Sequence, residues 1–101
     1  GPMIEAFLHL RDPSDAWLRD VPLRGDRLVI GRSPRVDLVL ESGHVSRQHA
    51  ELTRDAGGVW WIRDLGSVNG TLVNGVVLVR PHPLALGDRV EIEGFTLLCR
   101  A

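Results

Sequence analysis

Apolar residues along the chain fall into short runs separated by turn-forming residues, and this pattern predicts β-strands. In the segment Arg89–Glu93, charged residues alternate strictly with Val90 and Ile92. No window places apolar residues at positions i, i+3, i+4 and i+7 over three turns, so no helix is expected. Strands are predicted at residues 3–10, 16–18, 27–30, 37–40, 48–54, 59–65, 71–73, 76–78, 89–93 and 95–99. Short strands with frequent turns indicate an all-β sandwich or barrel.

Two Asn-Gly pairs occur in different settings. Asn74-Gly75 lies between two apolar runs at two-residue loop spacing, which predicts a hairpin with a type I′ turn. Asn69-Gly70 has no comparable strand directly before it, so this pair requires another explanation. Pro81 and Pro83 predict an edge strand or a loop, because proline cannot donate to a sheet ladder.

The length and composition predict one globular domain. The chain has 101 residues, of which 44% are apolar and 25% are charged. We expect this domain to span residues 3–101, with Gly1-Pro2 as the remnant of a protease-cleaved tag. We also expect it to be one module of a longer multidomain protein.

Several classes of protein are excluded by charge and hydropathy. The net charge is −1 and the pI is near 6.5, which argues against a nucleic-acid-binding protein. No apolar run approaches the roughly 18 residues of a transmembrane helix, and no signal peptide is visible, so no membrane association is expected. The single cysteine, Cys99, lies in an apolar run and is expected to be a buried thiol in a reducing, cytoplasmic compartment.

Three predicted loops carry the residues with potential for chemistry. All 12 basic residues are arginine, so any cationic site must use a guanidinium, which suits bidentate contact with phosphate. Arg32 follows Gly31 at a strand end, where glycine indicates a tight backbone turn. Ser46 and Arg47 offer a hydroxyl and a second guanidinium, and the Asn69 amide can bond a peptide main chain on both sides.

Each of these residues also has a purely structural interpretation. Arg32 could pair with a neighbouring carboxylate, Ser46 could cap a turn, and Asn69 could be a turn residue at positive φ. A catalytic triad of Ser46, His49 and Asp64 is disfavoured, since no Gly-x-Ser-x-Gly elbow is present. We expect His49 instead to be partly buried, with its ring bonded to the loop backbone.

A metal site at His44 and His49 is disfavoured as well, because no further histidine or cysteine lies at ligand spacing. We therefore expect no metal, no cofactor and no catalytic residue.

Taken in order, these motifs resemble the forkhead-associated (FHA) domain. The resemblance extends from about Leu28 to Leu98. The motifs that carry it are Gly31-Arg32, Ser46-Arg47-Gln48-His49, Asp64-Leu65-Gly66-Ser67-Val68-Asn69-Gly70-Thr71, Asn74-Gly75 and Gly87-Asp88-Arg89-Val90. The resemblance implies a sandwich of two twisted sheets with about eleven short, mostly antiparallel strands and the binding loops at one end. It also implies a non-catalytic module that binds phosphothreonine in a partner protein.

The resemblance assigns binding roles residue by residue. Arg32 and Ser46 are implied to contact the phosphate. Arg47 is implied to contact the phosphate or the adjacent peptide backbone. Asn69 is implied to hold the peptide main chain beside the phosphothreonine.

The remaining loop positions are implied to shape the site or its preferences. Gly31, His49 and Gly70 look like the scaffold residues of the family. Val68 departs from the family, which often has Ser or Thr there, so one phosphate donor is missing. His44 and Val68 are candidates for specificity.

We expect this module to serve bacterial Ser/Thr kinase signalling, since arginine without lysine is typical of high-GC coding. The alternative is a phospho-independent interaction or assembly domain that uses a sheet face, for which an exposed patch at Trp60 or Trp61 would be expected.

Overall fold

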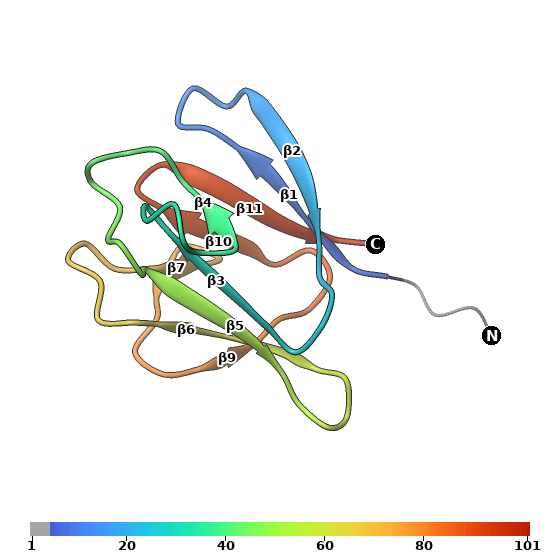
Figure 1. Cartoon of the computed structure of the whole chain (residues 1–101). Coiled ribbons are helices and arrows are strands. Elements are labelled where there is room, and N and C mark those ends of the chain that lie inside the picture. Colours follow the sequence, from blue (N-terminus) through green and yellow to red (C-terminus); the bar gives the residue numbers. More distant parts are fainter. Residues whose placement is uncertain (1–4) are drawn as a thin grey trace.

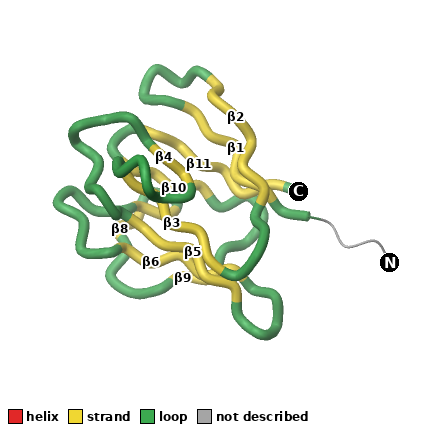
Figure 2. Tube along the Cα trace, viewed as in Figure 1, coloured by secondary structure: helices red, strands yellow, loops and turns green. Residues whose placement is uncertain are grey.

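The computed structural model describes residues 5–101, and within them all regular structure is β-strand (Figures 1 and 2). The predicted tag remnant and the start of the first predicted strand lie outside the described residues. The eleven strands are β1 (Phe7–Arg11), β2 (Trp17–Pro22), β3 (Arg27–Gly31), β4 (Leu38–Val39), β5 (Ala50–Arg54), β6 (Trp60–Asp64), β7 (Leu72–Val73), β8 (Val76–Val77), β9 (His82–Pro83), β10 (Arg89–Ile92) and β11 (Phe95–Arg100).

The strands form two sheets that pack face to face (Figure 1). One sheet has six strands in the order β2-β1-β11-β10-β7-β8, and the other has five in the order β4-β3-β5-β6-β9. Among the described residues every pair is antiparallel except β3 with β4. The predicted two-sheet, mostly antiparallel sandwich is confirmed.

The core lies between the sheets and follows the alternation of the strands. On β10, Val90 and Ile92 are buried while the neighbouring charged residues face outward. Leu52 and Ile62 are opposite each other on β5 and β6 and are fully buried. Each such side chain stabilises the fold by roughly 1.5–3 kcal/mol relative to an exposed one. Cys99 also lies in this core, and burial, with a smaller effect of Asp88, raises the pKa of its thiol.

Two local predictions, the turn at Asn74-Gly75 and the edge position of Pro83, are confirmed. Asn74 and Gly75 have φ values of 51° and 80°, as a type I′ turn between β7 and β8 requires. β9, which contains Pro83, is the edge of the five-stranded sheet. Since an edge strand has one unpaired side, proline is tolerated there.

Several predicted strand boundaries are wrong. β2 runs from Trp17 to Pro22, whereas the predicted strand ends at residue 18. β4 is only two residues long, and the carboxylate of Asp37, directly before it, accepts a hydrogen bond (2.8 Å) from the backbone N–H of Val29. β5 begins at Ala50 rather than Gln48, although the backbone N–H of His49 still donates to the carbonyl of Ile30 on β3 (2.8 Å).

Gly31 is essential to the packing of the loops at one end of the sandwich, for a reason that differs from the sequence prediction. Its φ is not positive, so no tight turn requires glycine there. Instead, a Cβ at this position would overlap the carbonyl oxygen of Arg47 and lie 2.8 Å from its carbonyl carbon. Glycine therefore permits the close approach of β3 to the loop that follows β4.

A buried carboxylate ties three strands together on the outer face of the five-stranded sheet. Glu51 is 4% exposed, and it accepts hydrogen bonds from Nε of Arg27 (2.5 Å) and Nε of Arg63 (2.8 Å). Burial alone would raise the pKa of Glu51, but the two guanidinium groups outweigh it, and the net effect lowers the pKa. These two ion pairs link β3, β5 and β6, the three strands that border the loops at one end of the sandwich.

Replacing this carboxylate is expected to destabilise the fold. Glu51→Gln should lower the free energy of unfolding by about 1–2 kcal/mol, since the two arginines remain partly solvated. Because the folded pKa lies below the ordinary 4.5, this contribution is present above pH 4.5 and is lost as pH falls through the folded pKa. Urea denaturation at pH 7 and pH 3 measures both effects. Glu91→Gln, at an exposed pair with Arg89, should change stability by less than about 0.5 kcal/mol, and an equal effect of both variants would contradict the account.

Gly31→Ala is expected to be far more harmful than a matched change nearby. The added Cβ must push β3 away from the loop, with a loss of about 2 kcal/mol or more in the free energy of unfolding. Gly43→Ala, in a loop position with nothing within 4 Å, should change it by less than about 0.5 kcal/mol. Thermal denaturation of the two variants side by side makes the comparison. Equal melting temperatures would show that the close approach is unimportant.

Candidate functional site

Three loops meet at one end of the sandwich, at the left of Figure 1, and hydrogen bonds join them. They are residues 32–37 after β3, 40–49 after β4 and 65–71 after β6. The backbone N–H of Arg32 donates to the carbonyl of Ser46 (3.0 Å). The backbone N–H of Val68 donates to the Ser46 hydroxyl oxygen (3.1 Å), and the Asn69 amide donates to the carbonyl of His44 (3.3 Å). The middle loop is thus bonded to both of the others.

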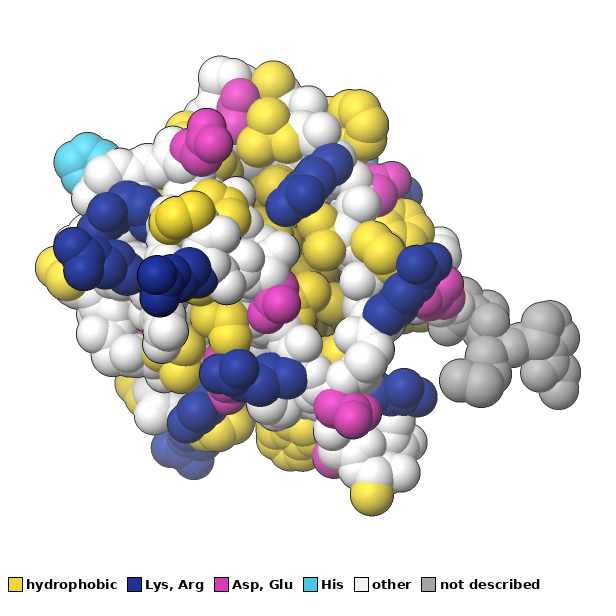
Figure 3. Space-filling model, viewed as in Figure 1, with side chains coloured by type: hydrophobic (Ala, Val, Ile, Leu, Met, Phe, Trp, Pro, Cys, Tyr) yellow, Lys and Arg dark blue, Asp and Glu magenta, His cyan; other side chains and the backbone are white. Residues whose placement is uncertain are grey.

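A shallow depression of about 190 Å³ lies where the loops meet. Its lining consists of Arg32, Gly43, His44, Val45, Ser46, Val68 and Asn69. Within residues 5–101 no carboxylate lines it, and basic side chains gather at the same end of the molecule, at the left of Figure 3. The depression therefore has a cationic, donor-rich wall suited to an anion.

Arg32 is held at one end and free at the other. Its Nε donates to the carbonyl oxygen of Val45 (3.0 Å), which fixes the direction of the side chain. Among residues 5–101 no carboxylate lies within salt-bridge distance of this guanidinium. The pairing considered in the sequence interpretation is thus not found. The four N–H donors on Nη1 and Nη2 are left to bind a ligand.

His49 holds Ser46 in place from behind. Its ring is fully buried rather than partly buried as expected, and its Nδ1 accepts a hydrogen bond from the backbone N–H of Ser46 (3.1 Å). Its Nε2 donates to the carbonyl of Gly70 (2.8 Å), which requires the tautomer with the proton on Nε2. The ring therefore bridges two of the loops through their backbones.

These contacts rule out the arrangement of a catalytic triad in this structure. Both ring nitrogens of His49 bond to backbone groups, so neither is available to the Ser46 hydroxyl. The oxygens of Asp64 bond to Ser67 and Thr71 instead of to the histidine. The Ser46 hydroxyl, which accepts from Val68, keeps its own proton for donation to a ligand.

Asp64 organises the third loop, a role that the sequence reasoning missed. One carboxylate oxygen accepts from the hydroxyls of Ser67 (2.5 Å) and Thr71 (2.8 Å), and the other accepts from the Ser67 backbone N–H (2.9 Å). Burial alone would raise the pKa of Asp64, but these hydrogen bonds outweigh it and lower the pKa. The signal was an Asp followed three residues later by Ser, a spacing at which short polar side chains bond the local backbone.

Asn69 and Gly70 have separate tasks in this loop. Asn69 does not have positive φ, so the turn interpretation considered for it does not hold. Its Oδ1 and one amide N–H remain for a ligand after the bond to His44. Gly70 has φ of 89°, and its backbone N–H donates to the hydroxyl of Ser67 (2.9 Å).

The three other residues predicted to contact the ligand, Val68, His44 and Arg47, lie at different distances from the depression. Val68 is 86% exposed at the rim, and the neighbouring hydroxyl of Ser67 is occupied by Asp64, so neither supplies a side-chain donor. His44 lines the depression and is exposed. Arg47 is exposed on the middle loop but does not line the depression. The structure thus brings Arg32, Ser46 and Asn69 together and leaves Arg47 outside.

Residues 5–101 contain no group of three or more His, Cys, Asp or Glu side chains placed to hold a metal ion. In the same part of the chain, no helix has the length and hydropathy to cross a membrane.

Comparison with known proteins agrees with this geometry. Residues 28–93 match the sequence model of the FHA domain. The glycogen accumulation regulator GarA of Mycolicibacterium smegmatis is 46% identical over 68 residues, which are 67% of this chain and 42% of GarA. The FHA domain-containing protein FhaB of Mycobacterium tuberculosis is 32% identical over 72 residues, which are 71% of this chain and 46% of FhaB. The chain thus spans less than half the length of these relatives.

Solved structures give the same result. A domain from a study of phosphothreonine-dependent FHA domain interactions superimposes with a TM-score of 0.83 at 33% identity, over 97% of both chains. Mycobacterium tuberculosis EmbR, in complex with a low-affinity phosphopeptide, superimposes with a TM-score of 0.85 at 33% identity, over 99% of this chain and 25% of EmbR. By sequence model, relatives and structure alike, the chain belongs to the FHA domain family.

Proposed function

We propose that this domain binds a phosphothreonine-containing segment of a partner protein in Ser/Thr kinase signalling. The observation that carries the proposal is the state of Arg32. Its guanidinium is anchored through Nε, has no carboxylate partner in the described part of the chain, and lies in a depression that also contains the Ser46 hydroxyl. A cation kept unpaired beside further donors is suited to a dianion.

The phosphate would be bound by fixed donors. It carries about −1.5 to −2 charges near neutral pH and has three acceptor oxygens. Arg32 would supply guanidinium N–H groups, and Ser46 would supply its hydroxyl proton. The carbonyl of Val45 already holds the side chain of Arg32, and the ring of His49 already holds the backbone of Ser46. Little conformational entropy is therefore lost when the phosphate binds.

The peptide around the phosphothreonine would be held by the rim. The Asn69 amide can donate to a peptide carbonyl and accept from a peptide N–H. Arg47, which lies outside the depression, is better placed for the peptide backbone or side chains than for the phosphate itself. His44 and Val68 lie at the rim and would influence which neighbouring residues are preferred.

The alternative is phospho-independent assembly through a sheet face, for which an exposed patch at Trp60 or Trp61 was expected. The two tryptophans do not provide it. Trp60 is 8% exposed and belongs to the core, and the Trp61 indole donates to the carboxylate of Asp55 (2.9 Å). Neither residue forms an exposed apolar patch.

We further propose that the domain is not an enzyme and acts in the cytoplasm. The ring of His49 is bonded to the backbone N–H of Ser46, which does not activate the serine as a nucleophile. The single buried cysteine is compatible with a reducing compartment.

Peptide titration tests the proposal. A phosphothreonine peptide should bind the wild type, and Arg32→Ala should weaken binding about thirtyfold or more, because the guanidinium that would pair with the phosphate is lost. Arg35→Ala is the matched control in the same loop, and we expect an effect below about threefold. Isothermal calorimetry with matched phosphothreonine, phosphoserine and unmodified peptides measures these affinities. The proposal fails if, across a diverse library, phosphorylated peptides bind no better than unmodified ones.

A further inference from the structure

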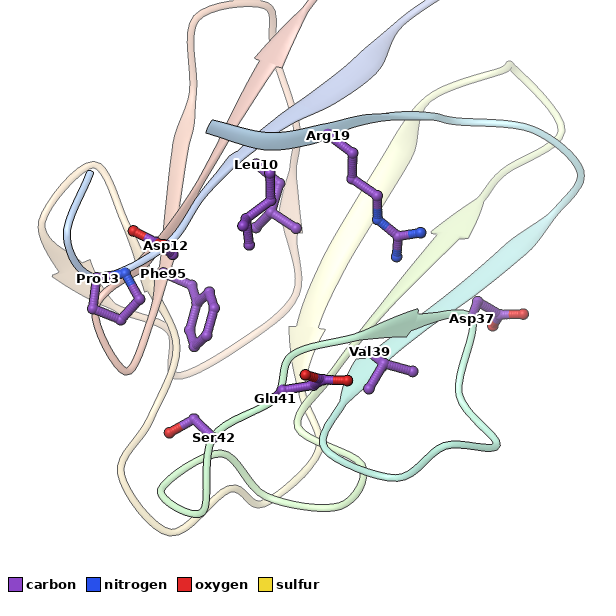
Figure 4. A pocket seen from close by; sticks show the side chains of 10 residues that line it. Leu10, Asp12, Pro13, Arg19, Asp37, Val39, Glu41, Ser42 and Phe95 are labelled. Atoms are coloured by element: carbon purple, nitrogen blue, oxygen red, sulfur yellow. The ribbon is translucent and has the colours of Figure 1, made fainter. Parts of the chain in front are cut away.

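A large cavity lies away from the phosphate depression, at the open side of the sandwich. It is a groove of about 740 Å³ between β2 and β4, which are the edge strands of the two sheets. Figure 4 shows Leu10 and Phe95 from the six-stranded sheet on one side and Val39 from β4 on the other. We call this cavity the β2/β4 groove.

A β-bulge shapes the groove on the β2 side. Leu10 pairs with Arg19 and Arg11 pairs with Trp17, so Leu18 is an extra residue without a partner on β1. As a result, the consecutive residues Leu18 and Arg19 both line the groove, whereas neighbours on a regular strand point to opposite faces. Bulges also hinder the addition of another strand at an edge. An occupant is therefore expected to bind through side chains rather than by extending the sheet.

The groove has an apolar floor and a negatively charged rim. Asp12, Asp37 and Glu41 contribute three carboxylates to the lining, and Arg19 contributes the one cationic side chain. Asp12 and Asp37 use one oxygen each in bonds to backbone or hydroxyl donors, and Glu41 makes no side-chain hydrogen bond within residues 5–101. No ion pair joins Arg19 to these carboxylates in the described structure, so the excess of negative charge is not neutralised.

The groove and the phosphate depression share one loop. Glu41 and Ser42 line the groove, and the residues that follow, from Gly43 to Ser46, line the depression. Four residues span at most about 14 Å of extended chain. One partner molecule can therefore reach both places at the same time.

We propose that the β2/β4 groove is a second docking site, which binds a cationic, aliphatic segment of the same partner that carries the phosphothreonine. The aliphatic side chains would pack on Leu18, which is 46% exposed, and on the partly exposed Val39, and a lysine or arginine would face the carboxylates of the rim. The assignment of the segment to the phosphorylated partner rests on the proposed function. The opposite charges of the two sites, cationic at Arg32 and anionic at Glu41, would fix the orientation of the partner.

Two matched synthetic peptides test the groove. Each carries one phosphothreonine and a flexible Gly-Ser linker, followed by a segment that alternates leucine with arginine in one peptide and leucine with glutamate in the other. We expect the arginine peptide to bind about tenfold more tightly than the glutamate peptide at low salt, because its charged segment also contacts the groove. The ratio of the two affinities should fall as added salt screens this contact. A ratio below about threefold would overturn the groove proposal.

Variants separate the groove from general electrostatics. Glu41→Gln should reduce the ratio of the two affinities by about threefold, because one rim carboxylate is lost without disturbing a hydrogen bond. Glu91→Gln changes the net charge equally on the outer face of the six-stranded sheet and should leave the ratio unchanged. A ratio unaffected by Glu41→Gln, or reduced equally by both variants, would contradict the proposal.

The same titrations distinguish failure of the groove from failure of the phosphate site. Unphosphorylated versions of the two peptides report the phosphate dependence, which tests the proposed function alone. Arg32→Ala should weaken both phosphorylated peptides together and preserve their ratio. A ratio abolished by Arg32→Ala would show that the charged segment binds at the phosphate depression and not in the groove.

Discussion

The functional end of this domain depends on the buried ring of His49. It accepts from the backbone of Ser46 and donates to the carbonyl of Gly70, so two loops that are separated in sequence are held by one side chain. Two other contacts support it. Gly31 lets the strand β3 approach the Ser46–Arg47 backbone, and Asp64 fixes the third loop through two hydroxyls and a backbone N–H. The contacts of His49, Gly31 and Asp64 involve backbone groups and loop side chains. The outward-facing donors of Arg32, Ser46 and Asn69 therefore remain free.

The free donors face the depression, where a ligand anion can reach them. Arg32 has no anionic partner among the described residues, and no carboxylate lines the depression around it. In contrast, Arg27 and Arg63 are paired with Glu51 on the sheet face behind the loops. Arg27 and Arg63 are thus neutralised where they support the sheet, whereas Arg32 lies beside a depression where a ligand anion can take the place of a carboxylate.

Much of the fold could be predicted from local patterns. The alternation at Val90 and Ile92 and the turn at Asn74-Gly75 depend on neighbours in the sequence, and both predictions were correct. The reason for Gly31 could not be predicted, because it depends on the distance between β3 and a loop fifteen or so residues later. The same holds for Arg47, whose position outside the depression is set by the course of the loop, and for the groove, which requires the bulge at Leu18 and the relative placement of two edge strands.

The loops of this domain already have their binding geometry before a ligand arrives. A crystal structure of the domain with a phosphothreonine peptide tests it most directly. The account predicts a phosphate oxygen within about 3 Å of both an Arg32 Nη atom and the Ser46 hydroxyl, and loop backbone shifts below about 1 Å. A phosphate bound elsewhere, or loops rearranged so that His49 no longer contacts Ser46 and Gly70, would contradict it.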